Sequence, residues 1–404
     1  MWSLKLPELY SLAVVVLLGY LIYYTTTVVK RPFLVTSNGP FRRYLRKHVP
    51  MTRCRYWPCW WCIEGRAQTL LARIVRSWMT PAVCYRRELL TLSDGGQVAL
   101  DWLDQGRTQE SPVVVILPGL LGDSQSEYVK HLARSTVSMG AKAVVFNYRG
   151  LAGVQLRTPR LYCACSVNDL SEVLNHVRSL NPKAKIATVG VSMGGLIVGN
   201  YLVHRTEESK EALTAAFTIS LPWNMFKGSE SIDRPIMNRL LGRHLTRSLC
   251  RLVSKHEVLW DEKHTWNMKN VMASRSIRDF DANFTCKNFG FKDLEHYYSH
   301  ATLHDKLDRV QVPLVCLNAA DDPFQPMDAV PVVAASKSSH VAIFVTVRGG
   351  HIGFLEGAWP FSREPFMCWL FRQFLTEVLY DVYGDFSSTT QLMLKHHQML
   401  NLRK

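Results

Sequence analysis

The stretch Gly190-Val191-Ser192-Met193-Gly194-Gly195 decides the interpretation of this chain. It follows residues 185–189, a run typical of a buried strand, and precedes residues 196–204, which are typical of a helix. A tight turn between strand and helix projects a serine hydroxyl to where a base and an acyl carbon both reach it, and the flanking glycines leave room for that turn. The context predicts a nucleophile elbow with Ser192 as the nucleophile.

A serine nucleophile needs a base and an acid that orients the base, and both have candidates downstream. Asp321 and Asp322 follow the predicted strand 314–317, and His351 follows the predicted strand 343–347. Because parallel strands end at the same edge of a sheet, these side chains are expected beside the elbow, in the chain order Ser, Asp, His. The residues alone do not separate Asp321 from Asp322.

The negative charge of an acyl-transfer intermediate needs two hydrogen-bond donors. One candidate is the backbone N–H of Met193, at the start of the helix after the serine. The other is the N–H of Leu120 in the loop Pro118-Gly119-Leu120-Leu121-Gly122, which follows the predicted strand 113–117.

Outward from the elbow, strands and helices alternate, which predicts a mostly parallel sheet covered by helices on both faces. A β-hairpin over residues 84–103 precedes the alternation, and an aromatic segment over about 222–308 interrupts it. That segment is interpreted either as a cap over the site or as an insertion with its own core. The remaining predicted elements are strands 143–147 and 215–221 and helices 128–139, 167–180 and 366–382.

Near the N-terminus, after a short tail of residues 1–8, residues 9–29 contain no charged side chain. As a helix they would span about 31 Å, the thickness of a bilayer core. A cleaved signal peptide is the alternative, but no convincing small-residue cleavage site follows. We expect an uncleaved transmembrane anchor.

Residues 1–87 hold fourteen Lys and Arg against Glu8 and Glu64, so most of the net charge of +15 lies here. Residues 30–83 are therefore expected to form a basic juxtamembrane linker that binds anionic lipids, because no nucleic-acid recognition motif accompanies the charge. The linker contains a predicted amphipathic helix at 63–78, on a membrane surface or on the core, and an interfacial patch of tryptophans and cysteines. By the positive-inside rule these charges favour a cytosolic main domain.

No cofactor or metal is expected. Cys54, Cys59 and Cys62 resemble half a zinc site, but no second ligand pair lies nearby. Ser192 also stands where a dinucleotide-binding fingerprint requires glycine.

The full set of motifs resembles the membrane-anchored α/β-hydrolase domain-containing proteins related to bacterial YheT-type esterases and yeast medium-chain fatty acid ethyl ester synthases. Besides the elbow, the resemblance rests on Trp61-Cys62-Ile63-Glu64-Gly65-Arg66, Phe146-Asn147-Tyr148-Arg149-Gly150, Asn318 to Pro323, and Gly349 to Gly357.

The resemblance implies an α/β-hydrolase domain over 84–384, followed by a C-terminal tail at 385–404. It also implies a serine hydrolase for lipid esters (phospholipids, monoacylglycerols or other carboxylic esters) with a Ser192-Asp322-His351 triad, Asp321 then holding the turn. Acyl transfer to an alcohol and a non-catalytic receptor or scaffold remain alternatives. For location it implies a single-pass protein of the endoplasmic reticulum or another endomembrane, with the catalytic domain away from the cytosol, in disagreement with the charge count.

Overall fold

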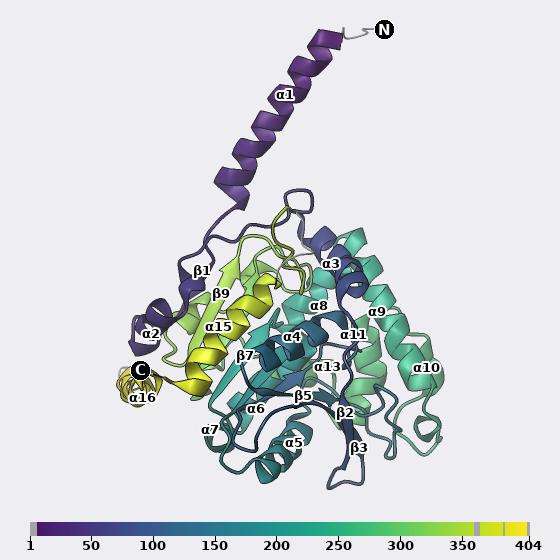
Figure 1. Cartoon of the computed structure of the whole chain (residues 1–404). Coiled ribbons are helices and arrows are strands. Elements are labelled where there is room, and N and C mark those ends of the chain that lie inside the picture. The colour runs from purple at the N-terminus through teal and green to yellow at the C-terminus, as the bar shows by residue number, and fades with distance from the viewer. Residues whose placement is uncertain (1–5, 359–363, 383, 402–404) are drawn as a thin grey trace.

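A nine-stranded sheet with the order β1-β9-β8-β7-β6-β4-β5-β3-β2 forms the centre of the computed structural model, which describes residues 6–358, 364–382 and 384–401 (Figure 1). Its middle strands pair in parallel, and antiparallel strands close both edges. The parallel strands are β4 (Val113–Leu117), β5 (Lys142–Asn147), β6 (Ile186–Val191), β7 (Ala215–Ile219), β8 (Leu314–Ala319) and β9 (Val341–Thr346). The antiparallel strands are β1 (Phe33–Val35), β2 (Arg86–Thr91) and β3 (Gln97–Leu103).

Helices cover both faces of this sheet, because its middle strands are apolar on both sides. In β4, Val113, Val115 and Leu117 join one buried cluster, whereas Val114 and Ile116 join the other. The first cluster packs under α5 (Val167–Leu180) and α6 (Met193–His204), and the second under α4 (Glu127–Ser138) and α15 (Phe366–Tyr380). The predicted architecture and the predicted β2–β3 hairpin are therefore confirmed.

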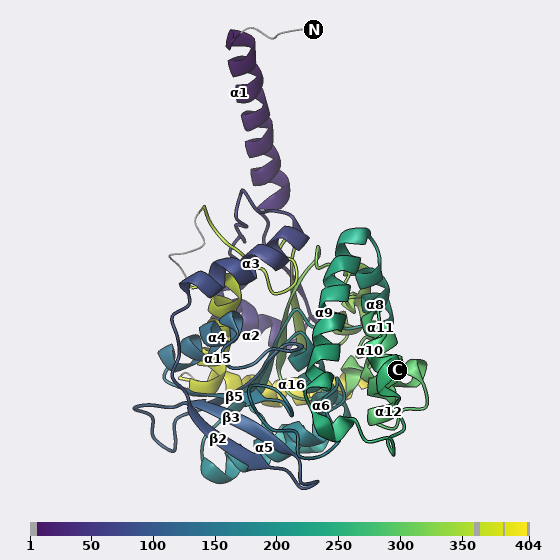
Figure 2. The same ribbon diagram turned by 90° about the vertical axis from the view of Figure 1, so that its right-hand side faces the viewer.

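Short helices dominate the segment between β7 and β8 (Figure 2). Most of its aromatic side chains, including Trp223, Phe284 and Tyr297, are buried within it, although Trp260 remains exposed. These side chains join the buried cluster on one face of the sheet, and the segment also roofs the cavity described below, which agrees with the cap interpretation. Its helices are α8 (Met225–Asp233), α9 (Ile236–Ser254), α10 (Met268–Met272), α11 (Ile277–Phe280), α12 (Cys286–Asn288) and α13 (Leu294–Ala301).

The N-terminal helix α1 (Leu6–Tyr23) projects away from the body, and none of its residues is buried (Figures 1 and 2). With the π-turn Tyr24–Val28 it forms a 23-residue candidate membrane span of mean hydropathy 1.8. The predicted span, residues 9–29, overlaps it closely. Of the predicted tail at 1–8, residues 6–8 belong to α1, and residues 1–5 lie outside the described residues.

Much of the expected basic linker is folded onto the body. β1 pairs with β9, and α2 (Pro40–His48) packs on α15 and on the C-terminal helix α16 (Asp385–Asn401). Helix α2 is basic overall, but Phe41, Tyr44 and Leu45 lie on one face at helical spacing and are buried. Residues 402–404 of the expected C-terminal tail lie outside the described residues.

The predicted amphipathic helix is present as α3 (Gly65–Met79), with Glu64 as its N-cap. Its apolar stripe is divided between two environments. Ala67, Leu71 and Val75 pack against a small buried cluster, whereas Leu70, Ile74 and Trp78 remain exposed. The shorter elements are α7 (Thr206–Ala212), α14 (Val332–Ser336), and the 3-10 turns Pro50–Thr52, Glu257–Leu259, Leu307–Arg309 and Met327–Ala329.

Candidate active site

Ser192 lies at the junction of β6 and α6 with a φ of 51°, in the left-handed region that non-glycine residues rarely adopt. Its N–H donates to the Ile219 carbonyl at 2.9 Å, which fixes the turn against β7. A Cβ at Gly190 would collide with the backbone of Gly194 and Gly195, so the turn requires the glycine that the sequence provides. This is the geometry of a nucleophile elbow.

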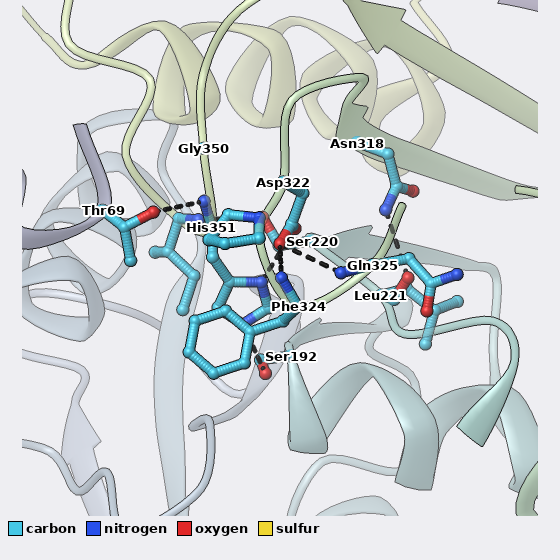
Figure 3. Close-up of polar contacts among 12 residues, drawn as sticks. Thr69, Ser192, Ser220, Leu221, Asn318, Asp322, Phe324, Gln325, Gly350 and His351 are labelled. Carbon is cyan, nitrogen blue, oxygen red and sulfur yellow. Dashed lines mark hydrogen bonds and ion pairs between the residues drawn. The ribbon is translucent and has the colours of Figure 1, made fainter. Parts of the chain in front are cut away.

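Figure 3 shows three side chains in a hydrogen-bonded row. The Oγ of Ser192 lies 2.8 Å from Nε2 of His351, and Nδ1 of His351 lies 2.8 Å from Oδ2 of Asp322. His351 and Asp322 are both buried, and the Phe324 ring packs against the imidazole with a centroid separation of 4.5 Å. The row has the geometry required for a base oriented by an acid.

The two adjacent aspartates occupy different environments. Asp322 Oδ1 accepts hydrogen bonds from the N–H groups of Phe324 (2.8 Å) and Gln325 (3.2 Å), which orients its other oxygen toward His351. Asp321 instead accepts from the Gly350 N–H at 2.9 Å. Burial raises the pKa of Asp321 to about 6, although the Gly350 N–H and Arg348 oppose that rise. The structure thus brings Asp322, and not Asp321, onto the histidine.

Side chains from three parts of the chain hold the backbone around His351. The N–H groups of residues 350, 351 and 352 donate to Asp321, to Thr69 on α3 (2.9 Å) and to Ser220 after β7 (2.9 Å), respectively. The buried guanidinium of Arg76, also on α3, donates to the carbonyls of residues 352 and 353.

Sequence reasoning identified neither Thr69 nor Ser220 as a site residue. Thr69 lies 282 residues before His351 in the sequence, and Ser220 lies 132 residues before Ile352. Neither residue stands in a recognisable motif.

The backbone amides of Met193 and Leu120 are the two expected oxyanion donors. Met193 and Leu120 both line the cavity above the serine, and within the described part of the chain neither N–H has a hydrogen-bond acceptor. The loop that carries Leu120 is fixed because the neighbouring amides of Gly119 and Leu121 donate to Tyr128 and Tyr162. A Cβ on Gly119 would lie 3.5 Å from Cβ of Ser192, so this loop closely approaches the serine. The pair can receive an oxyanion.

A cavity of about 970 Å³ opens over Ser192 and His351. Its walls come from α3, the loop after β4, and helices α8 and α9 of the segment between β7 and β8. Apolar side chains contribute to its lining, among them Leu196, Met225 and Ile232. This volume accommodates a long acyl chain together with part of a headgroup.

Cys54, Cys59 and Cys62 belong to no candidate ligand group within the part of the chain that the structure describes. Among the described residues, no group of three or more His, Cys, Asp or Glu side chains could hold a metal ion. Cys59 and Cys62 are buried, and burial raises their pKa values to about 12 and about 11. These thiols therefore stay protonated and enclosed, so they offer no exposed site for acylation.

The fold and the serine elbow define an α/β-hydrolase, and comparison with known proteins agrees. The sequence profile of the alpha/beta hydrolase fold matches residues 112–358, so the chain belongs to that family.

Three individual relatives show which proteins within this family the chain is similar to. The chain is 41% identical over 363 residues to Phospholipase ABHD3 of Homo sapiens. The aligned region covers 88% of this chain and 87% of that protein. It is 32% identical over 362 residues to Protein abhd-3.2 of Caenorhabditis elegans, with coverages of 89% and 94%. It is also 29% identical over 250 residues to a monoacylglycerol lipase of Saccharomyces cerevisiae, with coverages of 61% and 55%.

Proposed function

We propose that this protein is a serine hydrolase that cleaves lipid esters, with Ser192 as nucleophile, His351 as general base and acid, and Asp322 as the residue that orients the imidazole. The observation that carries the proposal is the continuous 2.8 Å row from Ser192 through His351 to Asp322 at the floor of a lipid-sized cavity. The names of the relatives, a phospholipase and a monoacylglycerol lipase, support the substrate class.

In the proposed reaction His351 takes the Ser192 proton as the oxygen attacks the ester carbonyl. The N–H groups of Leu120 and Met193 stabilise the resulting oxyanion. The protonated imidazole then gives its proton to the leaving alcohol, which departs and leaves an acyl-serine. A water molecule, deprotonated by the same histidine, attacks this ester and releases the fatty acid and free Ser192.

The test uses two separate samples of the full-length protein: one is labelled with a fluorophosphonate probe, and the other, unlabelled, is incubated with a mixed lipid extract that is then analysed by mass spectrometry. We expect the probe to label wild type and not Ser192→Ala, and one ester class to fall as its free fatty acid rises. Acyl groups that appear on an added alcohol instead would identify an acyltransferase. Absence of both labelling and turnover would identify a non-catalytic receptor or scaffold.

For location, we propose a single-pass protein of the endoplasmic reticulum or another endomembrane, held by α1 and by its basic N-terminal region. The apolar candidate span supports the anchor. Protease protection in sealed microsomes decides the orientation: the charge distribution favours a cytosolic catalytic domain, whereas the family resemblance favours the luminal side.

A further inference from the structure

Helix α3 has two faces with different tasks. One face carries Gln68, Thr69 and Arg76, whose side chains hold the backbone of residues 351–355. The other carries Leu70, Ile74 and Trp78, spaced four residues apart, so they form one stripe along the helix. An exposed stripe of this kind on a helix fixed by its opposite face needs an apolar partner.

The stripe continues onto two neighbouring segments. Trp57, Trp60 and Trp61 are exposed in the loop before α3, and Ile236, Met237 and Leu240 are exposed at the start of α9. Arg66 of α3 donates to Asn238 of α9 at 2.7 Å, which holds the two helices together. The exposed fractions of these nine side chains, called here the docking surface, run from 40% at Trp61 to 85% at Trp78.

The docking surface lies next to the candidate membrane span. Tyr24, directly after α1, donates to the Pro58 carbonyl at 2.6 Å, and Tyr20 of α1 donates to the Trp60 carbonyl. Figures 1 and 2 both place α3 on the side of the body from which α1 projects. If α1 crosses a bilayer, its base brings the tryptophan loop and α3 to the bilayer surface.

The mouth of the cavity lies within the same surface. Of the residues that line the cavity, Leu70, Arg73 and Ser77 on α3, Gln125 in the loop after β4 and His244 on α9 are exposed, so these three segments border the opening. A lipid that enters there passes from the docking surface directly toward Ser192.

We propose that the docking surface rests in the interface of a lipid bilayer, and that the substrate enters the cavity from that bilayer between α3 and α9. Tryptophans and aliphatic side chains with interspersed arginines, here Arg73 and Arg239, match the composition of segments that lie at the headgroup level. A protein partner would not explain why this surface adjoins both the candidate span and the cavity mouth. The proposal rests on the proposed lipid-ester substrate and on α1 as an anchor.

The first test locates the contact without measuring turnover. Full-length Ser192→Ala protein is reconstituted into phosphatidylcholine and phosphatidylserine vesicles that contain a phosphatidylcholine with a photoreactive diazirine in one acyl chain. After irradiation, peptide mass spectrometry should find label on peptides of α1, α3 and the start of α9. Peptides of α5, which lies on the far side of the body in both views, should carry none. Label confined to α1 would overturn the proposal.

The second test uses Ile74→Gln/Trp78→Gln and Met237→Gln, none of which lines the cavity. Leu180→Gln on α5 is the matched control, since Leu180 is 43% exposed. We expect the docking variants to lose about fivefold or more of their hydrolysis of vesicle phosphatidylcholine, because less apolar surface enters the bilayer. Hydrolysis of water-soluble p-nitrophenyl butyrate should stay at the control level.

The outcomes separate this proposal from the proposed function. Unchanged phosphatidylcholine hydrolysis in the docking variants overturns the docking surface while the esterase stands. A wild type that cleaves neither ester overturns the esterase, and the labelling pattern still decides the docking surface. Equal loss on both esters indicates a disturbed fold, in which case labelling of the Ser192→Ala protein again decides.

Discussion

At the scale of residues, two adjacent carboxylates in the loop after β8 have become chemically distinct. Asp322 faces His351 and receives two backbone hydrogen bonds, which fix the orientation of its carboxylate. Asp321 faces the Gly350 amide in a buried position, and its Oδ2 has no hydrogen-bond partner among the described residues. The chain order of the residues named the pair without dividing the roles, because both aspartates follow the same strand; the family resemblance was needed to favour Asp322.

The difference between the two aspartates predicts different losses on mutation. Asp322→Asn should lower kcat by about ten thousandfold, because an amide favours the wrong imidazole tautomer. Asp321→Asn keeps an acceptor for the Gly350 N–H and should lose less than about tenfold, the effect of one altered hydrogen bond. Steady-state hydrolysis of p-nitrophenyl butyrate measures both. Equal losses would show that the two carboxylates are not separated in function.

Asp321 also predicts a pH dependence of stability. Its folded-state pKa of about 6 lies above the ordinary value, so the folded protein binds a proton more tightly than the unfolded chain. The stability that the folded protein gains from this tighter proton binding is complete below about pH 4, and it is lost as the pH rises through 6. Relative to wild type, Asp321→Asn should therefore gain stability between pH 4 and pH 7, on the order of 2 kcal/mol. Thermal unfolding of both proteins across this range is the measurement, with exposed Asp328→Asn as control. A stability difference between Asp321→Asn and wild type that stays constant with pH would contradict this prediction.

At the scale of elements, α3 positions the loop that carries His351. Thr69→Val removes the acceptor of the His351 N–H without changing the side-chain shape, so a buried donor is left unpaired. We expect kcat to fall about tenfold with little change in KM, since the imidazole and not the substrate is displaced. Thr69→Ser should restore the rate. Failure of serine to rescue would indicate that Thr69 acts only through packing.

The packing of α2 gives a stability test for the N-terminal region. Phe41 is 1% exposed and lies near Phe374 of α15, whereas Phe33 of the edge strand β1 is 62% exposed. Phe41→Ala should destabilise the fold by about 3–5 kcal/mol, because it leaves a cavity in the core. Phe33→Ala should change the free energy of unfolding by about 0.5 kcal/mol or less. Similar shifts in thermal unfolding for both variants would mean that α2 is only loosely attached.

The elements that the sequence predicted share one property: within each of them, apolar residues recur at a regular spacing along the chain. Strands such as 113–117 and helices such as 167–180 were found with their bounds, because apolar residues recur there at strand or helix spacing. The strand β1 is only three residues long, and α2 carries more charge than apolar surface, so both were expected within a linker. Their structure comes from distant partners on β9, α15 and α16, which local periodicity does not record.

At the scale of the whole molecule, the candidate membrane span α1 makes few contacts with the body of the protein. Helix α1 buries no residue, and near its end Tyr20 and Tyr24 contact the tryptophan loop while Tyr23 contacts Arg348. The body has two separate cores on the two faces of the sheet, and neither includes a residue of α1. Loss of the anchor should therefore change where the protein acts and leave its chemistry intact.

Removal of residues 1–19 tests this separation and keeps Tyr20 with its partner loop. The shortened chain should hydrolyse p-nitrophenyl butyrate within about twofold of wild type, because no core residue is lost. It should leave membranes on carbonate extraction, yet still bind vesicles reversibly through the docking surface, since one apolar contact without a span gives only weak attachment. Adding Ile74→Gln and Trp78→Gln should abolish that residual binding in vesicle sedimentation. A shortened chain that binds vesicles equally well with and without these two substitutions would show that the bilayer contacts the body elsewhere.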